Sequence, residues 1–159
     1  MKHDTLIQAM NDSIAKANET MLKNLGGPFG AAVVNQETGE IISVSSNSVL
    51  STKDPTAHAE VNAIREACKK LDTFDLSGHV VVTTCYPCPM CLGAMVWANI
   101  SKFYYGSTAQ DAAEIGFRDE AIYEYLRGEN KSLIWAEQIV RDKTIKLFLD
   151  YSKLSKEIY

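Results

Sequence analysis

The sequence of 159 residues contains no long run of apolar side chains. No stretch of 18 or more apolar residues occurs, so a membrane-spanning helix is excluded. Residues 1–5 include an acidic side chain and lead into no apolar segment typical of a secretory signal. Cysteines are few as well: there are four, three of them within seven positions, which is not the pattern of a secreted disulfide framework. These absences predict a cytoplasmic protein.

Clusters of basic residues are also absent. The chain has 16 lysines and arginines against 20 acidic residues, which gives a formal net charge of −4. A nucleic-acid surface normally shows grouped basic side chains, so this balance disfavours a nucleic-acid partner. There is no repeat, low-complexity tract or linker, and the length fits one domain spanning residues 1–159. Hydrophobic residues make up 46% of the chain, enough for a substantial core.

Hydrophobic periodicity predicts an α/β domain. Apolar residues that recur every three or four positions indicate helices, and short β-branched runs indicate strands. The expected elements are helix 5–25, strands 29–34 and 40–46 as a hairpin, helix 57–71, strand 79–84, helix 89–98, strand 103–106, a mostly helical segment 111–126, a fifth strand 133–140 and helix 142–154. Strands joined by helical crossovers predict a five-stranded mixed sheet, largely parallel, within a three-layer α/β/α fold.

Two cysteines mark the start of the helix expected at 89–98. Cys88 and Cys91 are three positions apart, so both sulfurs project the same way from its first turn. The helix N-terminus favours thiolates, and Pro89 suits the first helical position because its missing N–H has no helical partner. Two thiolates would repel each other without a cation between them, and zinc is the expected cation.

A third ligand is available at the start of the helix expected at 57–71. His58 with Cys88 and Cys91 makes three protein ligands, which leaves the fourth position of a tetrahedral zinc ion open. An open position is typical of catalytic zinc, which lowers the pKa of water to about 7. Glu60, two residues after the histidine, is expected to reach that water without binding the metal.

Two other metal sites remain compatible with these cysteines. Cys85, Cys88 and Cys91 are evenly spaced, so Cys85 as a fourth ligand would give a closed structural zinc site in a binding module. The same spacing begins an iron–sulfur run of the ferredoxin type, but the expected fourth cysteine followed by proline is missing. Cys68 fits the apolar stripe of its helix, and Cys85 at a strand end is expected to face the sheet.

The motifs His58-Ala59-Glu60 and Pro87-Cys88-Pro89-Met90-Cys91 match the signature of zinc nucleobase deaminases. Segments 26–33, 54–61 and 111–117 resemble bacterial guanine deaminases of the cytidine-deaminase superfamily, and the likeness extends from about residue 6 to residue 126. The resemblance implies a cytidine-deaminase-like fold, one Zn²⁺ per subunit and hydrolysis of guanine to xanthine and ammonia in purine metabolism. It also implies a homodimer with exchanged C-terminal segments.

The resemblance further implies roles for single residues. Glu60 is the catalytic residue, which takes the proton of the attacking water, passes it to a ring nitrogen and protonates the departing amine. The residues implied to bind substrate are Phe29 against the base, Asn47 and Asp119 as hydrogen-bonding groups, Ala59, and Tyr159 reaching in from the partner subunit. From the residues alone, the alternative roles are a core aromatic for Phe29, a turn residue for Asn47, a helix N-cap for Asp119 and a frayed terminus for Tyr159.

The ring substrate stays open among deaminases. tRNA adenosine deaminases share the Pro-Cys-Pro-Met-Cys helix, but their substrate requires positive charge for its phosphates. Tyr86 departs from the glutamate that relatives in both groups commonly carry at this position. That residue is not a metal ligand, so the difference affects the shape of the pocket and leaves guanosine, cytosine and other aminated rings as alternatives to guanine.

Overall fold

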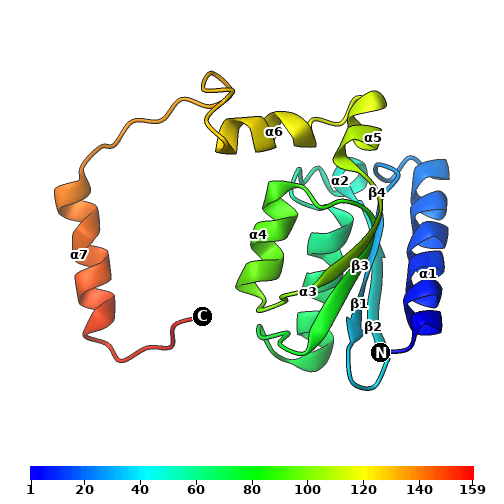
Figure 1. The fold of residues 1–159 in the computed structure, drawn as a ribbon. Coiled ribbons are helices and arrows are strands. Elements are labelled where there is room, and N and C mark those ends of the chain that lie inside the picture. The colour runs from blue at the N-terminus through cyan, green and yellow to red at the C-terminus, as the bar shows by residue number, and fades with distance from the viewer.

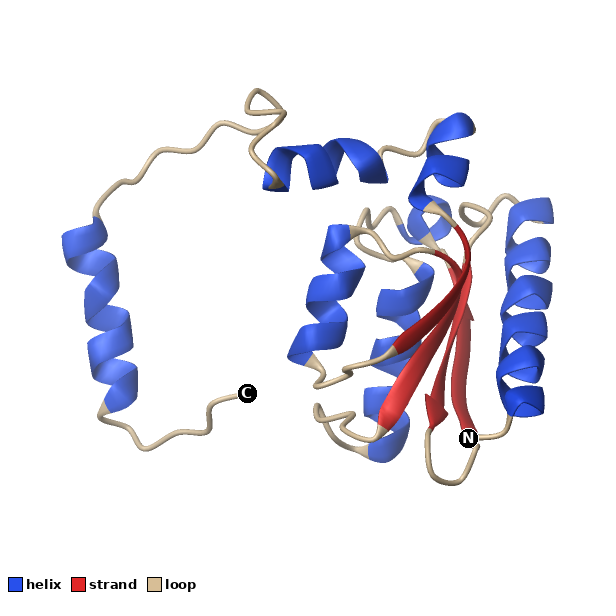
Figure 2. Cartoon of the chain, in the orientation of Figure 1, coloured by secondary structure: helices blue, strands red, loops and turns tan.

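The computed structural model describes residues 1–159 and shows a sheet between two layers of helices (Figures 1 and 2). Helix α1 covers one face, and α3 and α4 cover the other. The elements are α1 (His3–Leu22), β1 (Gly30–Asn35), β2 (Ile41–Ser46), α2 (Val49–Thr52), α3 (Ala59–Leu71), β3 (His79–Cys85), α4 (Pro89–Trp97), β4 (Phe103–Ser107), α5 (Ala109–Glu114), α6 (Asp119–Leu126) and α7 (Arg141–Ser152). None of the helices combines the length and the apolar character needed to cross a lipid bilayer.

The sheet is mixed, as predicted, but it is not largely parallel. Its strand order is β2-β1-β3-β4, and β1 runs antiparallel to both of its neighbours. Only β3 and β4 are parallel, because α4 connects them as a crossover. The prediction failed because β1 lies between β2 and β3 and pairs antiparallel with both, an arrangement that sequence order does not reveal.

The two central strands are apolar on both faces because helices cover both faces. Side chains alternate between the faces along a strand. Ala31 and Val81 join the core beneath α3 and α4, whereas Ala32 and Val82 pack with Ala9 of α1. All five residues are buried, so β1 and β3 hold the helices of both layers in place.

Gly30 lets α1 lie directly against the start of β1. A β-carbon at this position would collide with the carbonyl oxygen of Ser13, which belongs to α1. Only a glycine permits so close an approach of two backbone segments. Its N–H donates to the hydroxyl of Thr84 in β3, so the same residue joins three elements.

The predicted fifth strand is wrong. Residues 133–140 form no strand and run as a loop between α6 and α7, well away from the sheet (Figure 2). Trp135 is 81% exposed and Ile139 71% exposed. A β-branched, aromatic sequence becomes a strand only where a neighbouring strand pairs with it, and in this chain β4 remains the edge of the sheet.

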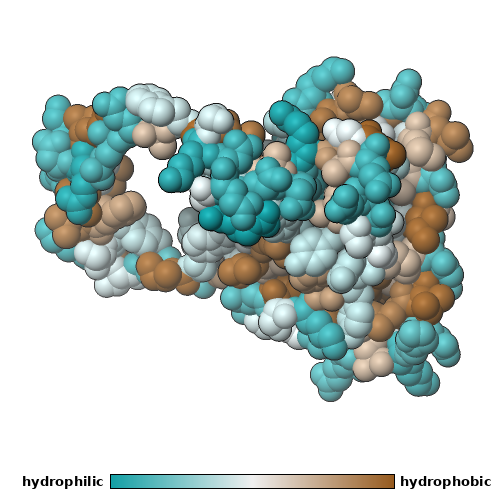
Figure 3. All heavy atoms as spheres, turned by 45° about the horizontal axis from the view of Figure 1, so that its top comes forward, coloured by the Kyte–Doolittle hydropathy of each residue, from teal (hydrophilic) through white to brown (hydrophobic).

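The last part of the chain, residues 127–159, forms what we call the C-terminal arm. It contains α7, which has no buried residue and stands apart from the sheet and its covering helices (Figure 1). Apolar side chains along the arm are exposed to solvent (Figure 3). Only the end of the arm returns to the rest of the chain. There the ring centroid of Tyr159 lies 6.3 Å from that of Phe74 and 6.0 Å from that of Trp97.

Candidate active site

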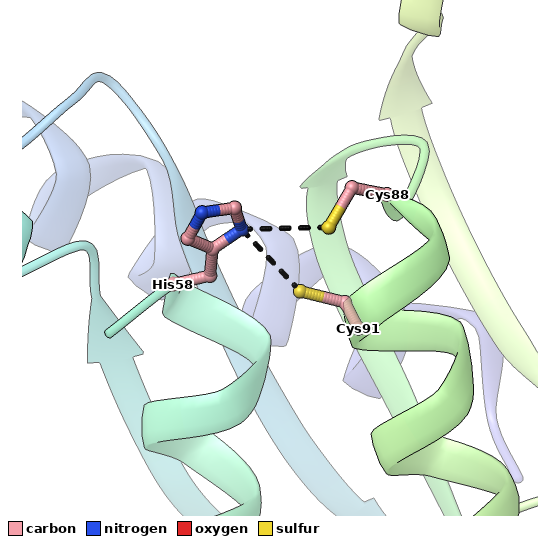
Figure 4. A group of neighbouring side chains, drawn as sticks. All are labelled: His58, Cys88 and Cys91. Atoms are coloured by element: carbon pink, nitrogen blue, oxygen red, sulfur yellow. Dashed lines mark hydrogen bonds between the residues drawn. The ribbon is translucent and has the colours of Figure 1, made fainter. Parts of the chain in front are cut away.

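Two helix N-termini meet at one end of the sheet. His58 is the N-cap residue of α3, and Cys88 is the N-cap residue of α4, with Cys91 in the following turn. The imidazole from α3 faces both sulfurs from α4 (Figure 4). The positive ends of both helix dipoles therefore point toward the two thiols and stabilise negative charge on them.

The distances among the three side chains suit a tetrahedral zinc ion. The Nδ1 atom of His58 lies 3.5 Å from Sγ of Cys88 and 3.6 Å from Sγ of Cys91. Zinc–sulfur and zinc–nitrogen bonds at a tetrahedral angle would separate nitrogen from sulfur by roughly 3.6 Å. All three ligand atoms lie within 4.8 Å of one another. The residues predicted to hold zinc are thus brought together at the required spacing.

The ionisation of the two thiols also fits a cation. The hydrogen bond with Cys91 lowers the pKa of Cys88 to about 4, with burial opposing this effect and His58 adding to it. The pKa of Cys91 is raised, first by its hydrogen bond to Cys88 and then by burial. The protein atoms alone therefore stabilise one thiolate of the pair. A divalent metal ion stabilises the second, since coordinating thiols are deprotonated.

Cys85 does not join the group. Its Sγ donates to the carbonyl oxygen of Thr108 at 3.4 Å, at the start of α5, and burial raises its pKa to about 11. The cluster of potential ligands consists of His58, Cys88 and Cys91. Cys68 packs against the core beside α3. Neither the closed zinc site nor the iron–sulfur arrangement considered from the sequence is assembled.

Glu60 lies beside the cluster and is almost completely buried, with 6% of its surface exposed. Its Oε1 accepts a hydrogen bond from the hydroxyl of Thr83 at 2.9 Å, and its Oε2 accepts one from the thiol of Cys91 at 3.4 Å. Burial is the main reason why the pKa of Glu60 is raised. Once Cys91 ionises to bind metal, it has no proton to donate, which leaves Oε2 as a free acceptor beside the metal ligands.

A cavity of about 270 Å³ opens in front of this cluster. Its walls include His58, Glu60 and Cys88, together with three of the five residues that the resemblance assigned to substrate: Phe29, Asn47 and Asp119. Residues from four different parts of the chain thus surround one space beside the metal ligands. A cavity of this size accepts a small planar ring.

The side-chain amide of Asn47 is hydrogen-bonded to the protein through its oxygen, but not through its nitrogen. Its Oδ1 accepts hydrogen bonds from the N–H groups of Gly27 and Val49, at 3.2 and 3.0 Å. No protein group accepts from its Nδ2, although the residue is only 5% exposed. Gly26 passes so close that a β-carbon there would collide with the Asn47 backbone. The amide is therefore held with its two N–H donors available to a ligand.

Asp119 is the first residue of α6 and not its N-cap, a position that Arg118 occupies. The alternative role suggested by the sequence is therefore wrong. Burial, followed by the charge of Cys88, raises the pKa of this carboxyl. Its oxygens make no hydrogen bond to a side chain, so they are available as acceptors at the wall of the cavity.

One aromatic residue of the cavity wall was missed as a site candidate. Phe117 packs edge-on against Phe29, with ring centroids 4.8 Å apart, and forms the same wall. The signal was its position two residues before Asp119 in a segment already used for the resemblance. Tyr86, which was expected from the sequence to affect the shape of the pocket, lines the cavity and packs against the rings of Phe103 and Tyr105.

Two predicted substrate residues lie elsewhere. Ala59 is fully buried in the core beneath α3, so its side chain does not line the cavity. Tyr159 is 74% exposed and contacts Phe74 and Trp97 rather than its own chain's cavity. Within one chain, Tyr159 therefore cannot close the site.

Comparison with known proteins identifies relatives of this chain in both sequence and structure. The profile of the cytidine and deoxycytidylate deaminase zinc-binding region matches residues 3–107. The guanine deaminase of Bacillus subtilis (strain 168) is 44% identical over 124 residues, which are 78% of this chain and 76% of that protein. A tRNA-specific adenosine deaminase from Aquifex aeolicus (strain VF5) is 48% identical over 80 residues, 50% of this chain and 52% of that protein. The X-ray structure of guanine deaminase from Bacillus subtilis superimposes with a TM-score of 0.88 and 36% identity, covering 100% of this chain and 99% of that one.

Proposed function

Because the chain belongs to the cytidine and deoxycytidylate deaminase zinc-binding family, we propose that it hydrolyses guanine to xanthine and ammonia. The observation that carries this proposal is the position of Glu60 at the wall of a cavity beside three metal ligands, with Asn47 and Asp119 in the same walls. The similarity to a guanine deaminase along three quarters of the chain supports the choice of base.

The donor set of His58, Cys88 and Cys91 would hold one zinc ion per chain. When bound, zinc activates a water molecule near neutral pH and stabilises the negative charge that develops during attack on the ring. Three protein ligands leave a position for that chemistry, and Cys85 is engaged with Thr108. The remaining steps belong to side chains of the protein.

Glu60 acts as the proton carrier. Its buried carboxylate takes one proton from the attacking water and delivers it to a ring nitrogen of guanine. The second proton of the same water then passes through the carboxyl group to the amine on C2, the bond between C2 and that nitrogen breaks, and ammonia leaves while the water oxygen stays on C2. The raised pKa of Glu60 suits a group that must both accept and return protons near neutral pH. The hydroxyl of Thr83 holds one carboxyl oxygen in place during these transfers.

The hydrogen-bonding groups of the cavity suit guanine better than adenine. Guanine presents N1–H as a donor, which the Asp119 carboxylate accepts, and a carbonyl oxygen at C6, to which Asn47 Nδ2 donates. Adenine has an unprotonated N1 and an amino group at C6, so both contacts would be lost. The rings of Phe29 and Phe117 enclose the base from the side.

One experiment tests this function against its alternatives. The zinc-loaded protein is incubated with guanine, guanosine, adenine, cytosine and an adenosine-containing tRNA loop, and ammonia release is measured. We expect release from guanine, and none from the Glu60→Gln variant. Faster release from the tRNA loop would instead assign the tRNA-specific adenosine deaminase activity of other relatives.

We also propose that the protein is a homodimer in which the C-terminal arms are exchanged. The arm leaves apolar side chains exposed, including Trp135 and Phe148, and β4 leaves an unpaired sheet edge. Association of two chains would cover both the apolar side chains and the sheet edge. In an isolated chain, ordering the arm costs conformational entropy and buries little apolar surface in return. Exchange would also bring Tyr159 to the cavity of the partner. Light scattering of the purified protein measures the oligomeric state directly.

The proposed setting is purine metabolism in the cytoplasm. All four cysteines are free thiols, and the metal site requires Cys88 and Cys91 to remain reduced. A free purine base is the proposed small-molecule partner, and the net charge of −4 does not favour a nucleic acid.

A further inference from the structure

Helix α6 carries Asp119 to the cavity although none of its own residues is buried. It lies above α4, outside the sheet and its covering helices (Figure 1). One hydrogen bond joins α6 to the part of the chain that contains the sheet: the hydroxyl of Tyr123 donates to the carbonyl oxygen of Pro87 at 2.5 Å. Side-chain hydrogen bonds of the other residues in α6 stay within residues 119–129.

The Pro87 carbonyl depends on this hydroxyl. Pro87 is fully buried and precedes Cys88, the N-cap residue of α4, so its oxygen lies outside the helical hydrogen-bond pattern. No backbone N–H donates to it, which leaves Tyr123 as its partner. A buried carbonyl without a partner is costly, so the contact is a strong constraint on both segments.

Asp119 and Tyr123 are four residues apart in the same helix and therefore lie on the same face. At the other end, Phe117 packs against Phe29 just before α6 begins. The helix is thus held on either side of Asp119. One contact is that of Phe117 with the cavity wall, and the other is the hydrogen bond of Tyr123 to the residue before the metal ligand Cys88. This arrangement sets the distance between the Asp119 carboxylate and the metal ligands.

We propose that Tyr123 is a positioning residue that fixes Asp119 relative to the metal-binding loop and so sets the affinity for the base. The proposal rests on the function proposed above, in which Asp119 accepts a hydrogen bond from the base. The aromatic contact between Tyr123 and Tyr86, with ring centroids 6.3 Å apart, holds the hydroxyl toward Pro87.

The test compares two variants that each lose one hydroxyl from α6. Tyr123→Phe removes the hydrogen bond to Pro87, whereas Tyr125→Phe removes a hydroxyl that makes no hydrogen bond and serves as the control. Loss of one hydrogen bond predicts a rise in KM for guanine of about fivefold for Tyr123→Phe, with kcat nearly unchanged. Zinc content should equal that of the unaltered protein, and amide hydrogen exchange should accelerate in residues 119–126 only for Tyr123→Phe.

A double-mutant cycle with Asp119→Asn shows whether Tyr123 acts through Asp119. If it does, Tyr123→Phe raises KM in the unaltered protein but adds little in the Asp119→Asn background. An equal rise in both backgrounds, or unchanged exchange in α6, would overturn the proposal. The exchange measurement does not depend on activity. A protein that releases no ammonia from guanine would refute the proposed function while leaving the hydrogen-exchange comparison as the test of the Tyr123–Pro87 contact.

Discussion

The Nδ1 atom of His58 lies 3.5 Å from the Sγ atom of Cys88, although 30 positions separate the two residues in the sequence. This proximity exists because α3 and α4 pack side by side on one face of the sheet with their N-termini at the same end. Each helix start supplies a ligand and a positive dipole end. The metal site is therefore a product of helix packing on a rigid sheet, and no mobile loop has to close to form it.

The Glu60→Gln variant should retain zinc and lose nearly all turnover. Glutamine preserves the size of the side chain but cannot carry a proton, and general acid–base catalysis contributes about 10²- to 10⁴-fold. Zinc content and ammonia release are measured on the same sample. Glu66→Gln, on the same helix and bonded only to Ser45, is the matched control and should stay active. A metal-free Glu60→Gln protein would show that Glu60 is a ligand.

Removal of a metal ligand should cost both metal and stability. Cys88→Ser and His58→Ala should lose zinc, and their thermal unfolding should occur at lower temperature, because metal binding contributes to folding free energy. Cys85→Ser is the control, because Cys85 bonds to Thr108 and lies outside the cluster. Loss of zinc from Cys85→Ser would indicate a four-ligand site instead.

The proposed exchange of C-terminal arms predicts complementation between two impaired proteins. A chain lacking residues 157–159 should bind guanine weakly yet unfold at nearly the same temperature, because none of the three residues belongs to the buried core. A chain with Glu60→Gln keeps Tyr159 but cannot transfer protons. Mixed dimers combine an intact Glu60 with the partner's Tyr159, so co-expression should restore ammonia release. If each mixture stays as inactive as its components, the arm does not complete the partner's site.

A pH-dependent contribution to stability is expected at the start of α5. Thr108 and Asp111 form reciprocal hydrogen bonds there, and the backbone N–H of Thr108 is the main cause of the lowered pKa of Asp111. A folded-state pKa below the unfolded value stabilises the protein above about pH 4, and the effect is lost as pH falls through the lower folded value. Urea unfolding of Asp111→Asn should therefore differ from that of the unaltered protein at pH 6 and converge with it toward pH 3. Asp142→Asn, in the first turn of a helix without such a cap, is the matched control variant.

Much of the chemistry was decided by the sequence itself. The spacing of Cys88 and Cys91, with proline at the first helical position, determines that both sulfurs leave one helix turn together. Most helices and four strands also lie near the predicted ranges. The reason is that apolar residues recur with the period of a helix or of a strand within each element. These features depend on contacts within a few positions, which periodicity and turn chemistry encode.

Other features were decided only by the tertiary structure. Residues 133–140 have the composition of a strand but make no sheet, because strand formation requires a partner edge within reach. The pairing of β3 with β1, and the exclusion of Cys85 from the metal ligands, depend on which surfaces meet after the chain has packed. The link between Tyr123 and Pro87 is of the same kind, since 36 positions separate the two residues and no local pattern relates them.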